Sequence, residues 1–359
     1  MTAAFWRGKR VLITGHTGFK GSWLSLWLHG MGASVAGYAL PPGPGESLFE
    51  LAAVSDSLEE SAYSDIRQLD QLGGLMDRFQ PEVVFHLAAQ PLVRLSYLKP
   101  VETYHVNVMG AVNLLEAVRN HDSCRVVVMI TSDKCYENSE WVWAYRENDP
   151  LGGYDPYSSS KGCIELVTAA WRHSFFEASG AKGVALASAR AGNVIGGGDF
   201  SKDRLIPDIM TAVLKGEPVK VRSPDAVRPW QHVLEPLSGY LLLAERLWDS
   251  PGQYAESWNF GPSQDDARSV RGVLETLRQH LGSRLVWKID SASAPHEAHL
   301  LTLDSAKACT LLGWKPKWNL NRALEAVVEW WQAYESHRPL RDVVIRQIAA
   351  YESNKQESM

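Results

Sequence analysis

The stretch "TGHTGFKG" (residues 14–21) directly follows a short strand-like segment, "KRVLI" (9–13). It places glycines at positions 15, 18 and 21, where a first strand passes into a first helix. Glycines in such a turn permit a tight bend and let the backbone approach a diphosphate at the N-terminus of the helix. A purely structural turn is the alternative, but the position favours a dinucleotide site. We therefore expect cofactor contacts from Gly15, Thr17, Gly18, Phe19, Lys20 and Gly21.

Strand and helix patterns alternate along the first half of the chain. After the turn, Phe19, Trp23, Trp27 and Met31 recur every four residues, which is typical of a helix that buries one face. Strand-like segments follow at 33–39, 81–89, 125–132 and 183–192, with helical patterns near 100–120 and 156–178. This alternation predicts an α/β fold, a Rossmann-type doubly wound parallel sheet with helices on both faces.

The composition changes near residue 192, where the pattern becomes less regular and richer in glycine, proline and tryptophan. We expect residues 1–190 to form a nucleotide-binding domain, joined by part of 230–262. Residues 191–345 are expected to form mainly a smaller α/β substrate-binding region. Residues 346–359 are expected to form a tail.

Composition excludes several classes of protein. The 359 residues are 45% hydrophobic, which is enough for a large core, and the net charge is −5 without a run of one sign. These features disfavour a grip on nucleic acid or on an anionic membrane. No apolar stretch approaches the roughly 18 residues of a membrane helix, and the first residues lack the apolar middle of a signal peptide. We therefore expect a cytoplasmic protein, whose four cysteines, without a C-x-x-C pair, are reduced thiols.

A second motif, "YSSSK" (157–161), places Tyr157 and Lys161 on one face of a helix. A phenol with a reference pKa near 10 is a poor base at neutral pH, but a nearby ammonium and an oxidised nicotinamide stabilise the phenolate. Ser132, at the end of the 125–132 strand, can hydrogen-bond the reacting hydroxyl. An ordinary exposed helix pair is the alternative, since this motif is common by chance.

The sequence alone leaves the choice of dinucleotide open and gives little support for a metal. Tyr38, Ala39 and Leu40 occupy the region where an acid usually binds the adenosine ribose. Lys20 could lean toward a 2′-phosphate, so NAD and NADP both remain possible on chemistry alone. The spacing of the histidines at 232, 296 and 299 does not make a persuasive metal site, and we expect no metal.

Longer blocks in a fixed order carry a more specific resemblance. From about residue 5 to about 345, the chain resembles the CDP-D-glucose 4,6-dehydratases, a family of extended short-chain dehydrogenase/reductases. The matching blocks are "GHTGFKGSWL" (15–24), "HLAAQPLVRLSY" (86–97), "TSDKCYEN" (131–138), "GGYDPYSSSKG" (152–162), "ARAGNVIGGGDF" (189–200), "DRLIPD" (203–208), "RPWQHVLEPLSGYL" (228–241), "WNFGP" (258–262) and "PHEAH" (295–299).

The resemblance implies a reaction, a cofactor and an assembly. It implies a hydro-lyase that holds NAD tightly and converts CDP-D-glucose into CDP-4-dehydro-6-deoxy-D-glucose. NAD would be reduced and reoxidised within one turnover, on the route to the dideoxysugars of bacterial O-antigen polysaccharide. The helices near 100–120 and 156–178 resemble those that pair subunits in this superfamily, which implies a homodimer or homotetramer.

The resemblance also assigns catalytic roles. Tyr157 would take the proton from the sugar O4, assisted by Lys161 and Ser132. Water loss from C5 and C6 needs two further proton-transfer groups. Asp133 resembles the family's acid toward the C6 oxygen. Lys134 stands where the related dTDP-glucose dehydratases carry glutamate, and as a base it would have to be neutral, a state that burial near Lys161 would favour. The alternative is a lysine that only binds substrate oxygens.

Further binding residues follow from the matching blocks. Asp65 and Ile66 resemble an adenine contact, although an isolated Asp before a helix is more often an N-cap. The other cofactor contacts are expected from Leu87, Ala88, Ala89 and Gln90, together with Tyr157 and Lys161. Contacts to the sugar nucleotide are expected from Gln90, Ser132, Asn193, Arg204, Leu205, Arg228 and His299. Arg228 could instead form a surface ion pair. Ala294 and Pro295 replace an arginine of the dTDP enzymes, which indicates a different nucleotide.

Two other functions share part of this pattern. A nucleotide-sugar 4-epimerase uses Tyr157, Lys161 and the glycine turn, but has no use for an acid and an amine after Ser132. A catalytically silent dinucleotide-binding regulator would not need the set of Ser132, Tyr157 and Lys161.

Overall fold

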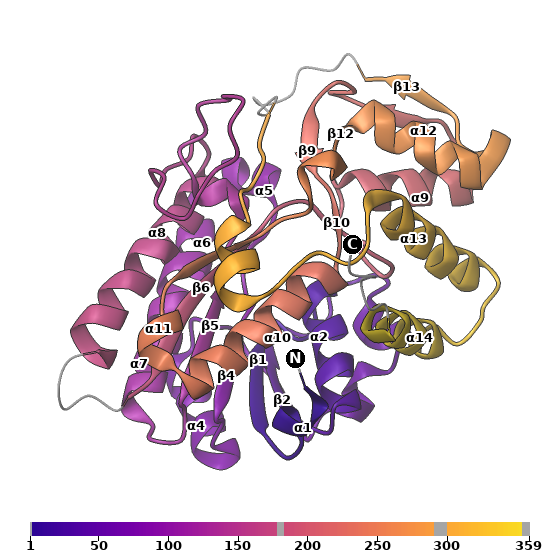
Figure 1. Cartoon of the computed structure of the whole chain (residues 1–359). Coiled ribbons are helices and arrows are strands. Elements are labelled where there is room, and N and C mark those ends of the chain that lie inside the picture. Colours follow the sequence, from indigo (N-terminus) through magenta and orange to yellow (C-terminus); the bar gives the residue numbers. More distant parts are fainter. Residues whose placement is uncertain (1, 178–182, 291–299, 354–359) are drawn as a thin grey trace.

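A seven-stranded parallel sheet forms the centre of the protein in a computed structural model that describes residues 2–177, 183–290 and 300–353 (Figure 1). The strand order is β3-β2-β1-β4-β5-β6-β11, with every neighbouring pair parallel. The strands are β1 (Arg10–Thr14), β2 (Ser34–Ala39), β3 (Glu60–Tyr63), β4 (Val83–His86), β5 (Val126–Ile130), β6 (Ala185–Ala191) and β11 (Ser257–Phe260). The predicted Rossmann-type sheet is confirmed, and β3 is a strand that the sequence pattern did not indicate.

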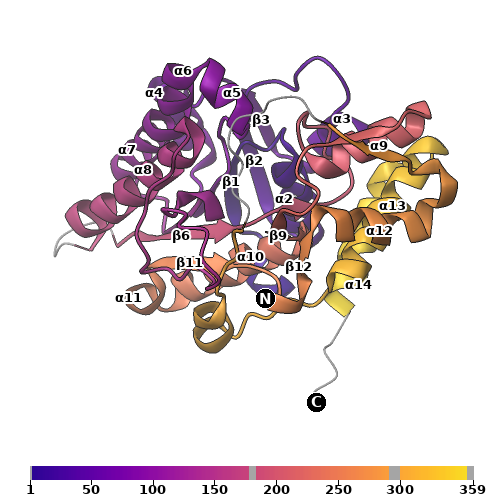
Figure 2. The same ribbon diagram turned by 90° about the horizontal axis from the view of Figure 1, so that it is seen from above.

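Helices cover both faces of the sheet because its strands are apolar on both sides. Val126 and Val128 of β5 pack into one core, whereas Val127 and Met129 pack into the other. One face is covered by α4 (Leu69–Phe79), α7 (Gly110–Asn120) and α8 (Pro156–Trp171). The other is covered by α2 (Phe19–Gly30) and α10 (Leu234–Asp249). Figure 2 shows α4, α7 and α8 grouped on one side of the sheet.

The aromatic stripe predicted for the first helix is buried in α2 except at Phe19, which is half-buried against the core. Trp23 and Trp27 are at most 1% exposed, and Met31 at the end of the helix is also buried. The shorter helices around the sheet are α1 (Ala3–Trp6), α3 (Leu48–Leu51), α5 (Val93–Leu98), α6 (Pro100–Tyr104) and α11 (Pro251–Tyr254). A π-helical turn joins α6 to α7, and a second extends α8 as far as Phe176.

A smaller region follows β6 and lies across the end of the sheet (Figure 1). It contains α9 (Leu205–Lys215), α12 (Val270–Leu281), α13 (Leu320–Glu335) and three short strand pairs. The pairs are β7 (Val194–Ile195) with β10 (Gln231–His232), β8 (Val219–Val221) with β13 (Trp287–Ile289), and β9 (Val227–Pro229) with β12 (Ala267–Ser269). Helix α10 and strand β11 lie within residues 230–262, the stretch expected to join the first domain, and both pack with the main sheet. The division into two domains remains a prediction.

The last helix, α14 (Leu340–Ser353), corrects the expectation of a tail from residue 346. Val343, Val344, Ile348 and Tyr351 are buried, and the Tyr351 hydroxyl donates to the Glu235 carboxylate at 2.7 Å. Their spacing places them on one helical face, which packs against the core. No helix in the described ranges combines the length and apolar character that a membrane span requires.

Candidate active site

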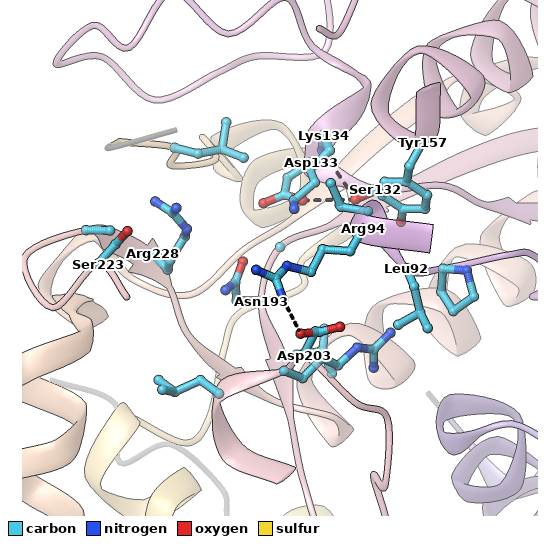
Figure 3. Close-up of a pocket in the computed structure, with 18 of the residues that line it drawn as sticks. Leu92, Arg94, Ser132, Asp133, Lys134, Tyr157, Asn193, Asp203, Ser223 and Arg228 are labelled. Carbon is cyan, nitrogen blue, oxygen red and sulfur yellow. Dashed lines mark hydrogen bonds and ion pairs between the residues drawn. The ribbon is translucent and has the colours of Figure 1, made fainter. Parts of the chain in front are cut away.

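A cavity of about 550 Å³ opens at the carboxyl ends of the parallel strands (Figure 3). One wall comes from the ends of β5 and β6 and from the start of α8, and the other from α9, β8 and β9. Open α/β sheets bind ligands at this edge. Of the predicted site residues, the cavity is lined by Lys20, Ser132, Asp133, Lys134, Tyr157, Asn193, Arg204, Leu205 and Arg228.

Strand β5 delivers three polar residues to the cavity in succession. The chain leaves the strand after Ile130 and enters a short 3₁₀ turn, η3 (Asp133–Cys135). Ser132 caps this turn, because its hydroxyl oxygen accepts from the Lys134 N–H at 3.3 Å. The same hydroxyl donates to Asp133 Oδ1 at 3.0 Å. The turn thus projects a hydroxyl, a carboxyl and an amine into one space.

The carboxyl group of Asp133 is set up to donate a proton. Its residue is only 3% exposed, and burial raises the pKa above its usual range, although Lys134 and the Ser132 hydrogen bond partly offset this. No described residue donates a hydrogen bond to Oδ2. A buried carboxyl with a raised pKa and one free oxygen has the properties of a general acid.

Lys134 is less buried than the proposed role of its amine as a base requires. Its side chain lines the cavity but is only half-buried, so the burial invoked to favour a neutral amine is incomplete. The predicted role of Lys134 as a base therefore remains a prediction, and so does its alternative as a binder of substrate oxygens.

The start of α8 fixes Tyr157 and Lys161. Asp155 caps the helix by accepting from the Ser158 N–H at 2.9 Å, and Pro156 occupies the first helical position. These two residues place Tyr157 in the first turn. Lys161 lies one turn further on, its ammonium 6.0 Å from the centre of the Tyr157 ring and 3.4 Å from the Ile130 carbonyl oxygen.

Burial works against the charged forms of both residues. It raises the pKa of Tyr157 to about 12, although the Ser132 hydroxyl and Arg204 lower it. It also lowers the pKa of Lys161 to about 8, while Glu165 opposes this shift. Without a ligand the phenol is therefore a poor base, and a cation beside it is needed to stabilise the phenolate.

A buried ion pair between β6 and α8 stabilises the elements that carry the site. Arg190 on β6 and Glu165 on α8 are 2.8 Å apart, and their side chains are at most 2% exposed. The Glu165 carboxylate also accepts from the hydroxyls of Ser188, at 2.6 Å, and Thr131. It thereby ties α8 to the end of β5, the two elements that carry the predicted catalytic residues. Sequence reasoning did not single out this pair.

The glycine turn has the geometry that a dinucleotide requires. Gly15 has φ +78°, and a Cβ there would lie 2.7 Å from the Ala88 nitrogen. A Cβ at Gly21 would lie 2.2 Å from the Gly15 carbonyl oxygen, so only glycine permits α2 to begin so close to the turn. The N-cap of α2 is Gly18, which offers no side chain to the first N–H groups. These residues fit a bound diphosphate, with open N–H donors at the positive end of the helix.

Three predicted residues form the opposite wall. Arg204 precedes α9 and pairs with Asp199 at 2.8 Å. Arg228 lies on β9, and Asn193 lies between β6 and β7. Figure 3 shows Asn193 and Arg228 across the cavity from Ser132 and Tyr157. The wall therefore offers guanidinium groups, which suit the oxygens of a diphosphate.

Other predicted residues lie away from this cavity. The Gln90 side chain accepts from the Leu92 N–H at 2.6 Å and donates to the hydroxyl of Thr103 in α6 at 3.0 Å, and it does not line the cavity. The Thr17 hydroxyl donates to the Leu40 carbonyl. Leu87, Ala88 and Ala89 follow β4 beside the glycine turn. His299 lies outside the described residues.

The Asp65 carboxylate is paired within its own loop. It accepts two hydrogen bonds from the Arg67 guanidinium, at 2.9 and 2.6 Å, and it does not cap α4, whose N-cap is Gln68. The N-cap alternative is therefore wrong. Ile66 is buried against Gly110. The adenine contact of Asp65 and Ile66 remains a prediction.

The structure adds an ion pair at the cavity that the sequence did not indicate. Arg94 of α5 reaches Asp203, 2.9 Å away, between the two walls (Figure 3). Both residues lie in or beside the matching blocks, which was the only available signal. Their 109-residue separation hid the pairing.

Comparison with known proteins agrees with this geometry. The family model described as GDP-mannose 4,6 dehydratase matches residues 12–327. The chain belongs to this family. The CDP-glucose 4,6-dehydratase of Salmonella typhimurium is 53% identical over 351 residues, covering 97% of this chain and 98% of the relative. The resemblance inferred from the motifs is thus confirmed.

More distant members of the dehydratase and epimerase group share the fold. A UDP-glucose 4-epimerase of Halalkalibacterium halodurans is 27% identical over 91% of this chain and 96% of its own length. The crystal structure of dTDP-glucose 4,6-dehydratase from Bacillus anthracis, in complex with NAD, superimposes with a TM-score of 0.76. That match covers 93% of this chain and 100% of the other at 21% identity, which supports the fold.

Proposed function

We propose that this protein is a CDP-D-glucose 4,6-dehydratase, an NAD-dependent hydro-lyase that forms CDP-4-dehydro-6-deoxy-D-glucose and water. The observation that carries this proposal is the 53% identity to a CDP-glucose 4,6-dehydratase over nearly the full length of both chains. The cavity agrees with it, because Asp133 and Lys134 stand beside Ser132 and Tyr157. An oxidation site with two additional proton-transfer groups is what a dehydration through a ketone requires.

The glycine turn and the start of α2 would hold the NAD diphosphate, with Tyr157 and Lys161 at the other end of the cofactor. Bound NAD would supply a hydride acceptor for C4 of the sugar and, once reduced, a hydride donor for C6, and in its oxidised form a positive charge for Tyr157. Such a charge lowers the pKa of the phenol, which burial alone has raised.

The proton transfers follow from the side chains of the cavity. Tyr157 takes the proton from the sugar O4, while the Ser132 hydroxyl turns from Asp133 Oδ1 to donate its hydrogen bond to that oxygen. The resulting C4 ketone acidifies the C5 proton, which leaves to a base. Asp133 then protonates the C6 hydroxyl, so that the C6–O bond breaks and water departs. Proton return to C5 completes the product.

We assign the removal of the C5 proton to Lys134. Its amine is the neighbour of Asp133 in η3 and lines the same cavity. A lysine that only binds substrate oxygens would leave proton exchange at C5 unaffected. Exchange of the C5 proton with solvent deuterium in Lys134 variants therefore separates the two roles.

The enzyme is tested by incubating it with CDP-, dTDP-, GDP- and UDP-glucose and identifying the products. We expect CDP-glucose to give the base-sensitive 4-keto-6-deoxy sugar without net formation of NADH. Recovery of CDP-galactose would instead establish a 4-epimerase. Absence of turnover with every substrate would favour a dinucleotide-binding regulator.

We also propose a homodimer or homotetramer in the cytoplasm. Helices α6 and α8 pack side by side. Exposed apolar side chains lie on these two helices, on the neighbouring α5 and on the π-helical turns that follow α6 and α8: Leu98, Val101, Met109, Leu166 and Phe175. Exposed apolar side chains that gather on one face would favour contact with a second subunit. All four cysteines are free thiols, which suits a reducing compartment. Light scattering of the purified protein tests the oligomeric state, and a monomer would contradict the assembly.

A further inference from the structure

Lys20 lies in the first turn of α2, within the glycine turn. The sequence left open whether its side chain leans toward a 2′-phosphate. The Lys20 side chain lines the cavity that contains Ser132, Asp133 and Tyr157. The residue is half-buried, and no described residue forms a hydrogen bond or an ion pair with its ammonium.

The charges around Lys20 do not neutralise it. Burial, together with the cations of Arg204 and Lys161, lowers its pKa to about 7, against weaker opposing effects of Asp133 and Asp199. Asp199 is already paired with Arg204, and burial favours the protonated form of Asp133. The Lys20 ammonium therefore faces the cavity without an ion-pair partner among the described residues, and the cations of Arg204 and Lys161 lie near it.

The position of the bound cofactor follows from its two ends. Its diphosphate belongs at the N-terminus of α2, where the N–H groups are open. Its nicotinamide has to reach the sugar carbon whose hydroxyl meets Tyr157 and Ser132, since hydride passes directly between them. The ring would therefore lie on the side of the α2 N-terminus that faces Tyr157 and Ser132. The backbone of Lys20 lies at the N-terminus of α2. Its ammonium interacts electrostatically with Asp133 and Lys161, which lie near Tyr157 and Ser132.

We propose that the Lys20 ammonium faces the nicotinamide end of the cofactor and favours its reduced form over its oxidised form. This inference rests on the proposed function for the identity of the cofactor. The oxidised ring is a cation and is repelled by a nearby ammonium, whereas the reduced ring is neutral. Lys20 would thereby draw the hydride onto the cofactor and hold it there while water is eliminated at C5 and C6.

The proposal matches a requirement of the reaction. A simple dehydrogenase releases its reduced cofactor, but a dehydratase has to retain it through the elimination before hydride returns to the sugar. Favouring the reduced ring lowers the chance that hydride goes back to C4 too early. Lys20 would thus set the preference for the reduced over the oxidised cofactor, whereas Tyr157 and Asp133 carry the proton transfers.

The test compares the affinities of the two cofactor forms in the absence of sugar. Purified protein is titrated with NAD⁺ and with NADH, followed by tryptophan fluorescence, near pH 6, where a group with a pKa of about 7 is mostly charged. In Lys20→Met the ratio of the NAD⁺ Kd to the NADH Kd should fall by about tenfold or more. Lys20→Arg, which keeps the charge, should leave the ratio within about twofold of wild type.

Other outcomes would overturn the proposal. Equal weakening of both forms in Lys20→Met would show that Lys20 binds the diphosphate, which the two forms share. An unchanged ratio together with weaker binding of CDP would assign Lys20 to the sugar nucleotide. Because no sugar substrate is present in the cofactor titrations, failure of the proposed dehydratase activity would not affect them. Failure to bind either cofactor form in wild type would refute the proposed function itself.

Discussion

Replacing Asp133 by asparagine should separate the two halves of the reaction. The substitution keeps the size of the side chain and its Oδ1 atom, which accepts from the Ser132 hydroxyl at 3.0 Å. It removes the acidic proton that burial retains by raising the pKa of the carboxyl group. In the proposed mechanism, oxidation at C4 uses Tyr157, Lys161 and Ser132, so it should continue in the variant, whereas protonation of the departing C6 oxygen should not.

The expected loss of turnover in Asp133→Asn follows from the proposed role of Asp133 as a general acid. A positioned general acid contributes about 10²- to 10⁴-fold to a rate, which corresponds to about 3–5 kcal/mol of transition-state stabilisation. No described residue donates a hydrogen bond to Oδ2 of Asp133, which leaves that oxygen available to the departing C6 hydroxyl. We therefore expect overall turnover of Asp133→Asn to fall by at least about 10²-fold.

The assay mixes the enzyme with CDP-glucose and follows the absorbance of reduced nicotinamide together with product. In Asp133→Asn a stoichiometric amount of NADH should accumulate while the 4-keto-6-deoxy product forms slowly. Asp203→Asn is the matched control, since it also removes a carboxylate at the cavity. It should not accumulate NADH, whatever its effect on KM. Turnover of Asp133→Asn within threefold of wild type would refute the acid assignment.

Three further predictions follow from the same site. Lys134→Ala should lose turnover and, in D₂O, incorporation of deuterium at C5; full turnover would exclude it as the base. Tyr157→Phe should lower kcat/KM by about 10²- to 10⁴-fold and abolish its rise with pH, because the phenol acts only when deprotonated and burial raises its pKa to about 12. Arg190→Met leaves a buried carboxylate unpaired and should lower the free energy of unfolding by about 3–5 kcal/mol, measured by urea denaturation. Arg284→Met breaks an exposed ion pair and should cost less than about 1 kcal/mol, so equal losses would contradict the argument.

Local patterns were sufficient to predict that Ser132, Asp133, Lys134 and Tyr157 meet at one wall of the cavity. The glycine turn, the polar end of β5 and the Tyr157 to Lys161 spacing each lie within a short stretch, and parallel strands bring their ends to one edge. The helix at α14 could also have been predicted, since Leu340, Val343, Val344 and Ile348 follow a helical spacing that the polar end of the chain obscured.

Contacts between distant segments were not predictable in the same way. The Arg94 to Asp203 pair and the buried Arg190 to Glu165 pair depend on how separate elements pack, and neither has a local signature. The direction of Lys20 is a similar case. Its place in the glycine turn was clear, but the sequence did not show whether its side chain follows the adenosine or faces the cavity.

The transfer of hydride within one molecule of substrate is the central claim of this account, and one isotope measurement tests it directly. CDP-glucose labelled with deuterium at C4 is incubated with the enzyme, and the product is examined by NMR and mass spectrometry. We expect a 4-keto-6-deoxy sugar that carries the deuterium at C6, with no net formation of NADH. Deuterium retained at C4 in CDP-galactose, or a 4-keto-6-deoxy sugar without the label at C6, would contradict it.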